Sequence, residues 1–332
     1  MDAKGTLLLK RNEVAALLGI EECMAAVEEV FKFYAEGKTA PPGVLGLHAR
    51  EGGFHIKAAL LDRVGKTYFA AKTNANFPQN VERFGLPLIQ GVIVLCDAES
   101  GYPLALMDST EITITRTGAA TGVAAKYLAR GDASVAAAFG CGNQGKISLR
   151  ALARVRSLER VFAYDKDAAQ AKRFAAELSG ELGVEVEAAG DPASAARRSD
   201  ICITCTPAKQ FFLKREDIRP GTFIAAVGAD SPEKQELEPE LLRGNKIVTD
   251  ITEQCATIGE LHHAIEAGLV TRADVHAELG DVIAGRRPGR TSPDEIIIFD
   301  STGTALQDVV AAAIVYERAV SAGAGIRLNF TA

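Results

Sequence analysis

The chain has 332 residues, of which 47% are hydrophobic and 24% are charged, and its formal net charge is −6. This length and composition predict a packed protein of about two domains. The acidic balance and the lack of a long Lys/Arg run disfavour nucleic acid and anionic membranes as partners. No run of about 18 apolar residues indicates a membrane-spanning helix. The first residues are too few and too polar for a secretory signal, so we expect a cytoplasmic protein.

The N-terminal third predicts a small α+β domain. Apolar residues at helical spacing indicate helices over residues 12–19 and 21–38. Three β-like runs follow over residues 53–61, 67–73 and 89–97, and segments rich in Asn, Gly and Pro separate them. We expect a mostly antiparallel sheet here, and then a helix over residues 110–130 that leads into the next domain.

Three basic residues of this region, Lys57, Lys72 and Arg116, stand in apolar surroundings. An unpaired buried charge is very costly, so each must reach water or meet an anion. One interpretation is an exposed strand or helix face from which the long side chain reaches water. The other is a clamp for a substrate carboxylate, for which Arg offers a fork of donors and Lys a point charge.

From about residue 133 to residue 301, apolar strands alternate with helical patterns, which predicts a doubly wound parallel sheet. The strands are expected over residues 135–140, 160–165, 184–188, 201–206, 222–228, 246–250 and 296–300, and helices over 146–157, 167–182 and 236–242. The apolar runs lack in/out alternation, as in strands buried on both faces. An alanine-rich helix over residues 304–319 then returns to the first domain.

The first of these strands ends in a G-x-G-x-x-G turn, formed by Gly140, Gly142 and Gly145. Such a turn lets the backbone approach a pyrophosphate at the start of a helix. Asp165, twenty residues after Gly145, closes the next strand, where it would meet the adenosine ribose. An acid there favours NAD over NADP, although Lys166 stands beside it.

The six cysteines do not indicate a disulfide framework or a metal site. Cys202 and Cys205 form a C-x-x-C on an expected strand, where residues three apart point to opposite faces. The adjacent His262 and His263 point about 100° apart on a helix and make a poor metal pair. We therefore expect no metal.

Asp230 follows the strand expected at 222–228, near where a nicotinamide would end. A carboxylate there can take or give a proton during hydride transfer. The context Asp-Ser-Pro also suits a turn aspartate. The residues alone leave both interpretations open.

Several blocks, in this order, resemble the ornithine cyclodeaminase/μ-crystallin family over nearly the whole chain. They are Lys72 with residues 77–80, and residues 97–105, 115–120, 140–145, 227–237 and 299–308. The resemblance implies a homodimer and a Rossmann domain over residues 118–303. It also implies a substrate-binding and dimerisation domain built from residues 1–117 and 304–332.

The resemblance further implies site residues. Lys72 and Arg116 match positions that bind the substrate carboxylate, and Asp230 matches the acid that handles the amine, so Asp230 and Lys72 are the expected catalytic residues. Many members carry an arginine near Gly43, and Lys57 is expected to supply that missing cation. The expected cofactor contacts are Gly140, Gly142, Asn143, Gln144, Gly145, Asp165, Thr206, Val227, Ser301 and Gly303.

The implied activity is NAD-dependent chemistry at the α C–N bond of an amino acid, as in ornithine cyclodeamination. An alanine-type amino-acid dehydrogenase and a reductase of cyclic imino acids are the alternatives within the family. The non-enzymatic alternative is a crystallin-like protein that binds a small ligand without converting it. The site residues do not name the amino or imino acid.

Overall fold

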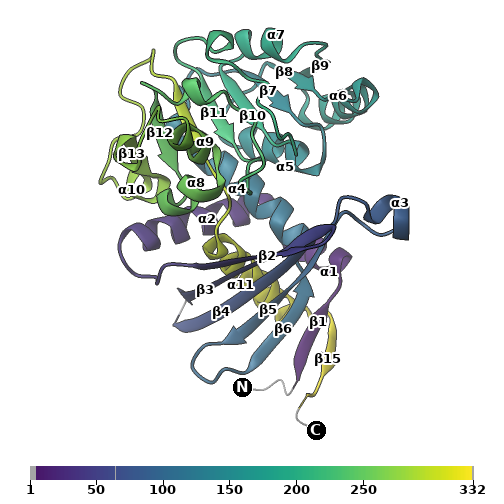
Figure 1. Ribbon diagram of the computed structural model, residues 1–332. Coiled ribbons are helices and arrows are strands. Elements are labelled where there is room, and N and C mark those ends of the chain that lie inside the picture. Colours follow the sequence, from purple (N-terminus) through teal and green to yellow (C-terminus); the bar gives the residue numbers. More distant parts are fainter. Residues whose placement is uncertain (1–4, 64, 331–332) are drawn as a thin grey trace. The chain divides into compact units, whose positions relative to one another are not determined.

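The computed structural model describes residues 5–63 and 65–330. The chain divides into two compact units, one built from the residues up to Arg116 together with those from Thr304 onward, and one from Thr117–Gly303 (Figure 1). The second unit is therefore an insertion in the chain of the first. We call them unit 1 and unit 2.

Unit 1 is built on a mostly antiparallel sheet, as the sequence predicts. Within the described residues its strand order is β15-β1-β6-β5-β4-β3-β2, and only β1 and β6 pair in parallel. The strands are β1 (Thr6–Leu9), β2 (Gly43–Ala49), β3 (Gly52–Arg63), β4 (Lys66–Asn76), β5 (Ile89–Asp97), β6 (Pro103–Asp108) and β15 (Ile326–Leu328). The sequence pattern did not predict β1, β2, β6 or β15. β2 is exposed throughout, so it lacks the in/out alternation on which a strand prediction depends.

Helices cover one face of this sheet. They are α1 (Arg11–Leu17), α2 (Ile20–Ala35) and α11 (Ala305–Ala322), while the short α3 (Asn80–Phe84) lies between β4 and β5 in the chain. α11 contacts β3, β4, β5, β6 and α2, so the end of the chain supplies the central helix of unit 1. Thr304 begins it as a capping box with Gln307. α4 (Thr110–Leu128) starts in unit 1 and continues into unit 2.

Unit 2 contains the predicted doubly wound parallel sheet. Its order over the described residues is β13-β12-β14-β11-β10-β7-β8-β9. The strands are β7 (Val135–Phe139), β8 (Arg160–Tyr164), β9 (Glu185–Ala188), β10 (Ile201–Thr204), β11 (Phe223–Ala226), β12 (Lys246–Thr249), β13 (Val275–Glu278) and β14 (Ile297–Asp300). The chain runs outward through β7, β8 and β9 and then returns to β10 on the other side of β7. The order therefore reverses between β7 and β10, and this Rossmann-type topology confirms the predicted fold class.

The helices of unit 2 are α5 (Asn143–Leu152), α6 (Ala168–Leu182), α7 (Pro192–Arg197), α8 (Thr252–Ile258), α9 (Glu260–Glu266) and α10 (Leu279–Ile283). The helix predicted over residues 236–242 is wrong. Only the single 3₁₀ turn Pro239–Leu241 forms there. The backbone N–H groups of Glu236 and Leu237 donate instead to the carboxylate of Glu260, which holds this segment extended.

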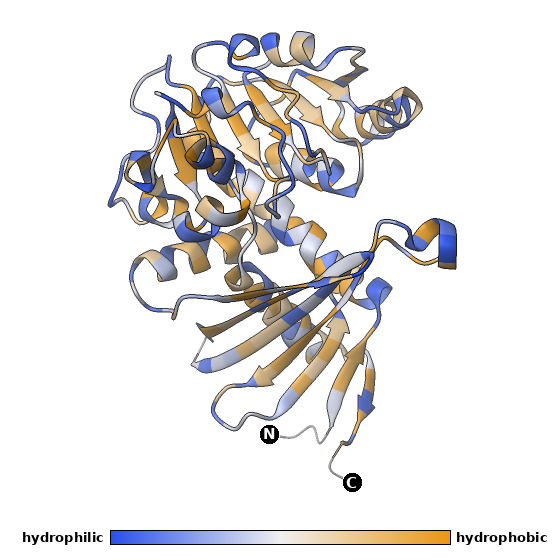
Figure 2. Ribbon diagram, in the orientation of Figure 1, coloured by the Kyte–Doolittle hydropathy of each residue, from blue (hydrophilic) through white to orange (hydrophobic). Residues whose placement is uncertain are grey.

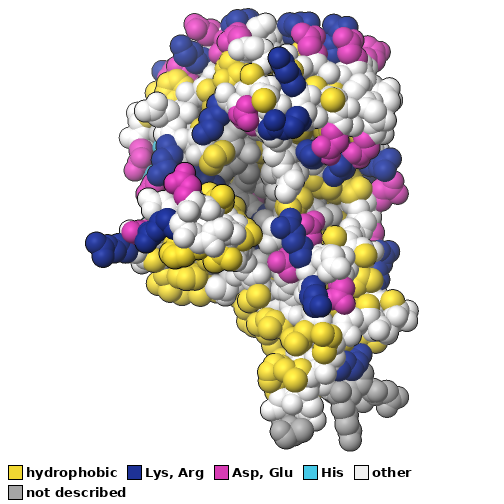
Figure 3. Space-filling model, turned by 90° about the vertical axis from the view of Figure 1, so that its right-hand side faces the viewer, with side chains coloured by type: hydrophobic (Ala, Val, Ile, Leu, Met, Phe, Trp, Pro, Cys, Tyr) yellow, Lys and Arg dark blue, Asp and Glu magenta, His cyan; other side chains and the backbone are white. Residues whose placement is uncertain are grey.

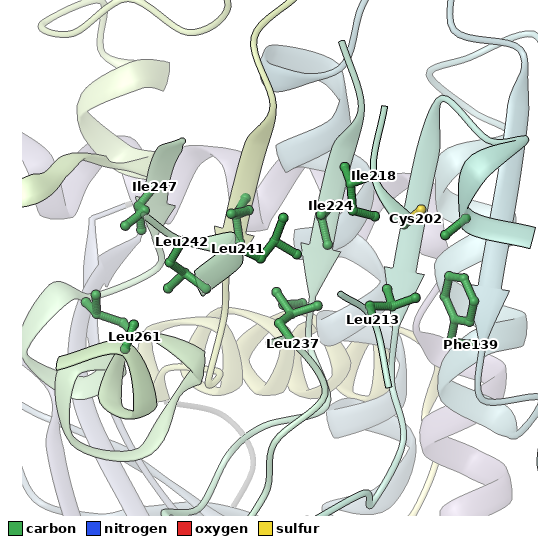
Figure 4. Packing of buried hydrophobic residues seen from close by; sticks show 14 of the residues in the cluster. Phe139, Cys202, Leu213, Ile218, Ile224, Leu237, Leu241, Leu242, Ile247 and Leu261 are labelled. Carbon is green, nitrogen blue, oxygen red and sulfur yellow. The ribbon is translucent and has the colours of Figure 1, made fainter. Parts of the chain in front are cut away.

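The core of unit 2 is formed by the apolar strands and the segments packed on them. Figure 2 shows the strands as its most hydrophobic elements. Figure 4 shows part of the buried cluster, to which the sheet contributes Phe139 and Ile224, and other segments contribute Leu237 and Leu261. This packing holds the carboxyl ends of the strands in a fixed register. Among the described helices, none has the length and hydrophobicity needed to cross a membrane.

Candidate dinucleotide and substrate sites

The glycine turn after β7 has the geometry that its sequence predicts. Gly140 has φ of 103°, and a Cβ there would lie 2.9 Å from the carbonyl oxygen of Cys205. A Cβ on Gly145 would lie 2.2 Å from the carbonyl oxygen of Gly140, so only glycine lets α5 approach the strand this closely. A Cβ on Gly142 would meet nothing within 4 Å. The backbone of Gly142 is therefore open to a ligand at the N-terminus of α5, where Asn143 and Gln144 begin the helix.

Asp165, directly after β8, is tied to this turn. Its Oδ2 accepts a hydrogen bond from the backbone N–H of Cys141 (2.9 Å), and its Oδ1 accepts one from that of Asp167 (3.0 Å). The carboxylate is half-buried. It thus joins the ends of β7 and β8 and retains lone pairs for a further donor, such as a ribose hydroxyl.

The other predicted cofactor residues follow strands that are neighbours in the sheet. Thr206 follows β10, Val227 follows β11, and Ser301 and Gly303 follow β14. The N–H of Val227 donates to the carbonyl of Thr204 (2.9 Å), and that of Ser301 donates to the carbonyl of Ala226 (3.0 Å). Because parallel strands end at the same edge, these residues share the carboxyl edge with the glycine turn.

The three basic residues that the sequence analysis singled out in unit 1 are buried rather than on an exposed face. Lys57 on β3 and Lys72 on β4 are directly opposite each other in the sheet register, and both are buried. They share the face that carries Ala59, Leu61 and Ala70, the face on which α11 packs. Two like charges opposite each other destabilise a sheet unless an anion compensates them.

That anion is Asp308 on α11. Lys72 Nζ lies 2.8 Å from Asp308 Oδ1 and 2.7 Å from Oδ2, and Arg116 Nε donates to Oδ1 at 3.1 Å. Arg116 Nη1 donates to Gln307 Oε1 (2.8 Å), and Lys72 also lies 3.3 Å from Thr113 Oγ1. Neither Asp308 nor Gln307 was among the site residues predicted from the sequence. An aspartate in the alanine-rich apolar run of α11 is the signal that could have revealed them.

The cluster of Lys57, Lys72, Arg116 and Asp308 holds three basic side chains and one carboxylate, all buried. Burial lowers the pKa of Lys72 to about 7, an effect that Arg116 and Lys57 increase and Asp308 opposes. The neighbouring cations, Lys72 foremost, keep the pKa of Asp308 below its usual range. The cluster therefore gathers basic side chains in a region shielded from water, which favours binding of an anion.

Asp230 lies in unit 2, four residues after β11 ends. Its side chain is exposed and forms an ion pair with Lys234 (2.6 Å). It is thus not a buried residue. Its place after β11 puts it at the carboxyl edge of the sheet, where the sequence predicted it.

The C-x-x-C cysteines and the adjacent histidines make contacts within unit 2. Cys202 is buried on β10, and Cys205 lies just beyond this strand, where its thiol donates to the carbonyls of Phe139 and Gly140. Burial raises the pKa of both thiols. The rings of His262 and His263 lie 5.1 Å apart, and one possible ligand atom from each of His262, His263 and Glu266 lies within 4.8 Å of the others. The prediction that the two histidines diverge too far to act as a metal pair is therefore wrong. His263 Nε2 contacts the carbonyl of Lys234 (2.8 Å), while His262 pairs with Glu266.

The reversed parallel sheet and the glycine turn define a class, that of proteins with a Rossmann-type dinucleotide domain. Residues 4–323 match the model of the ornithine cyclodeaminase/mu-crystallin family, so the chain belongs to this family.

Its relatives include enzymes of known activity. An alanine dehydrogenase of Archaeoglobus fulgidus is 42% identical over 98% of both chains. The structure of an archaeal alanine dehydrogenase dimer with bound NAD superposes with a TM-score of 0.93, at 42% identity, over 98% of this chain and 99% of the other. Thermococcus litoralis Δ(1)-pyrroline-2-carboxylate reductase, solved with NADH and L-proline, gives 0.91 at 34% identity, over 97% of this chain and 100% of the other.

Proposed function

We propose that the protein is an NAD-dependent oxidoreductase that acts on the α C–N bond of an amino or imino acid. The observation that carries this proposal is the buried cluster of Lys57, Lys72 and Arg116, in which Lys72 and Arg116 bind the carboxylate of Asp308. A buried excess of positive charge is stable only with an anion nearby, and the carboxylate of an amino acid is such an anion. The glycine turn of unit 2 supplies the complementary feature, a place for a dinucleotide.

The dinucleotide is held by the carboxyl edge of unit 2. Gly140, Gly142 and Gly145 admit the pyrophosphate, and the first amides of α5, at Asn143 and Gln144, face it. Asp165 accepts from the adenosine ribose, and its negative charge favours NAD over NADP. The remaining contacts come from Thr206, Val227, Ser301 and Gly303. When bound, NAD takes up or returns the hydride, and the protein supplies orientation and charge.

The substrate is held by unit 1. Arg116 binds the α-carboxylate, and Lys72 and Lys57 add positive charge to it. Lys72, whose pKa of about 7 lets it exist in both protonation states at neutral pH, can also exchange a proton with the substrate. Asp230 takes the proton of the substrate ammonium group as the C–N bond is oxidised, and returns it in the reverse direction.

Among the reactions that this chemistry allows, we place an alanine-type dehydrogenase first, because the relatives named alanine dehydrogenase share 42% identity with this chain. Water then attacks the oxidised carbon, and ammonia and a keto acid form. Reduction of a cyclic imino acid is the second candidate, favoured by the likeness to a reductase solved with L-proline. Cyclodeamination, in which a side-chain amine attacks instead of water, is the third.

The test is NADH fluorescence and absorbance with a panel of amino acids and cyclic imino acids, with products identified by mass. A keto acid, a reduced imine, or a cyclic product with released ammonia each identifies one reaction. Arg116→Ala and Asp230→Asn should each lower kcat/KM by at least about a hundredfold. Wild-type turnover in both variants would refute the assignment of the site, and a bound cofactor that never changes redox state would favour a binding protein.

We also propose a homodimer formed through unit 1. Figure 3 shows hydrophobic side chains gathered on the unit that carries both chain ends. Many of the exposed ones lie on β2, β3 and β5 and around α3; they are Val44, Leu45, Leu47, Phe54, Leu60, Val81, Phe84, Leu86, Leu88, Ile89 and Val92. An apolar area of this extent is typical of a protein–protein interface. The solved dimer of the archaeal alanine dehydrogenase supports a second copy of the chain as the occupant.

A further inference from the structure

A buried glutamate in unit 2 connects two loops at the carboxyl edge of the sheet. Glu236 is fully buried, and its Oε1 accepts a hydrogen bond from the backbone N–H of Thr206 (2.6 Å), in the loop after β10. Its Oε2 accepts one from the backbone N–H of Gly228 (3.1 Å), in the loop after β11. One side chain therefore fixes the distance between these two loops.

Glu236 is itself held by a second buried carboxylate. The backbone N–H groups of Glu236 and Leu237 donate to the two oxygens of Glu260, at 2.8 and 3.1 Å. The next residue, Leu261, donates its N–H to Asp300 Oδ2 (2.8 Å) at the end of β14. The loops after β10 and β11 and the end of β14 are thus joined through buried carboxyl groups, and none of these groups takes part in the proposed chemistry.

The backbone leaves room for these carboxyl groups. A Cβ on Gly228 would lie 2.3 Å from Glu236 Oε2, and a Cβ on Gly259 would lie 2.6 Å from Asp300 Oδ2. The φ of neither glycine is in the left-handed region, so space rather than conformation requires glycine there. The absence of a side chain at Gly228 therefore leaves the space that the carboxylate of Glu236 occupies when it accepts the Gly228 N–H.

The sheet order indicates which part of a dinucleotide these loops serve. A dinucleotide crosses the sheet edge where the strand order reverses, which here is between β7 and β10. The adenosine half lies on the side of β8, where Asp165 stands, so the nicotinamide half lies on the side of β10 and β11. The loops joined by Glu236 are on that second side, and the loop after β11 also carries Asp230.

We propose that Glu236 is a positioning residue that fixes the loops after β10 and β11 for the nicotinamide half of the dinucleotide. This inference rests on the proposed function. It assigns Glu236 no contact with the substrate. Its effect passes through the backbone of Thr206 and Gly228.

The experiment compares the affinities of the full-length protein for NADH and for ADP-ribose, which lacks the nicotinamide. In Glu236→Gln the amide oxygen can accept from one loop, while the amide NH₂ group faces the N–H of the other loop. We expect the dissociation constant for NADH to rise about tenfold or more, because one loop is released. The constant for ADP-ribose should stay within about twofold of wild type, because its contacts lie on the other side of the reversal.

Glu278→Gln is the matched control. Glu278 is a partly buried glutamate whose Oε1 accepts from the backbone N–H of Thr252 (2.8 Å), on the far side of the sheet from β7. The Glu278→Gln variant should bind NADH and ADP-ribose with the same affinities as the unaltered protein.

A second variant, Gly228→Ala, keeps Glu236 but displaces its carboxylate by steric contact. It should reproduce the selective loss of NADH affinity, so the inference does not depend on whether Glu236→Gln folds. An equal loss of NADH and ADP-ribose in both variants, or wild-type NADH binding in both, would overturn the inference. Failure of the unaltered protein to bind NADH would instead refute the proposed function on which it rests.

Discussion

Lys72 is the residue whose protonation most directly connects structure with activity. Its pKa, lowered by burial to about 7, means that the ammonium form prevails below pH 7 and the neutral amine above it. Only the ammonium attracts a carboxylate, so we expect KM for the amino acid to rise as pH increases through 7 to 8. In Lys72→Arg, whose side chain stays charged, this rise should disappear. Steady-state kinetics between pH 6 and 9 would check it, and an identical pH profile in both proteins would contradict it.

Asp308 illustrates how one carboxylate can decide the stability of a unit. Removal of its charge in Asp308→Asn takes from the buried side chains of Lys72 and Arg116 the carboxylate that binds both of them. We expect the free energy of unfolding to fall by about 3–5 kcal/mol, measured by urea denaturation. The double variant Asp308→Asn/Lys72→Met should recover part of this loss.

Asp62→Asn provides the control for this prediction. Asp62 is an exposed aspartate of the same unit that accepts from Thr67 Oγ1. This substitution should change the free energy of unfolding by less than about 0.5 kcal/mol. If the free energy of unfolding fell by a similar amount in both variants, the buried carboxylate of Asp308 would contribute no more to stability than an exposed aspartate does.

At the scale of elements, two glycines of the turn after β7 have different effects. Gly140 matters for the stability of unit 2, and Gly142 matters for the affinity for NADH. Gly140→Ala forces an unfavourable φ and a contact with the carbonyl of Cys205, so it should destabilise unit 2 by about 1–3 kcal/mol. Gly142→Ala places its methyl group in open space at an allowed φ of −89°, so the melting temperature should not change. Its affinity for NADH should nevertheless fall about tenfold or more, because the methyl group occupies the approach of the phosphates. Calorimetry and fluorescence titration would measure the two effects, and unchanged NADH affinity in Gly142→Ala would argue against pyrophosphate binding at this turn.

The elements that could be predicted from sequence are those in which burial requires a recognisable pattern of hydrophobic residues. The strands from β7 to β12 have predicted positions that agree with the structure to within two residues at each end. All are short apolar runs buried on both faces except the edge strand β9, in which exposed glutamates alternate with half-buried residues. β2 is exposed on both faces, and β13 contains His276 and Glu278, so neither shows that pattern. The segment 236–242 has helical spacing, but Glu260 binds its amides. Such a long-range contact leaves no local signal.

The same distinction applies to the candidate site. Lys57, Lys72 and Arg116 attract attention because a charge in an apolar run is anomalous by itself. Asp308 is also a charge in an apolar run, but it lies 236 residues after Lys72, so the sequence does not identify the two as partners. The glycine turn was predictable in full because its geometry depends on residues within one short segment.

For the whole molecule, the exposed apolar residues of unit 1 lead to a prediction about assembly. Leu45→Glu combined with Leu47→Glu places two charges on β2, in the proposed interface. Sedimentation should show a change from twice the mass of the chain to the 35.1 kDa of a single chain. Val320→Glu, an exposed apolar position on α11, should leave the assembly unchanged. A single-chain mass for the unaltered protein would contradict the proposed dimer.

The insertion of unit 2 within the chain of unit 1 also has a consequence for synthesis on the ribosome. Lys57 and Lys72 are translated early, whereas Asp308 emerges only after the whole of Thr117–Gly303 has been made. Until then Lys72 lacks the buried carboxylate that binds it in the folded unit and must keep its ammonium group in water. The N-terminal sheet therefore cannot close around its helix co-translationally, and the segment in the middle of the polypeptide is the first that can complete its fold.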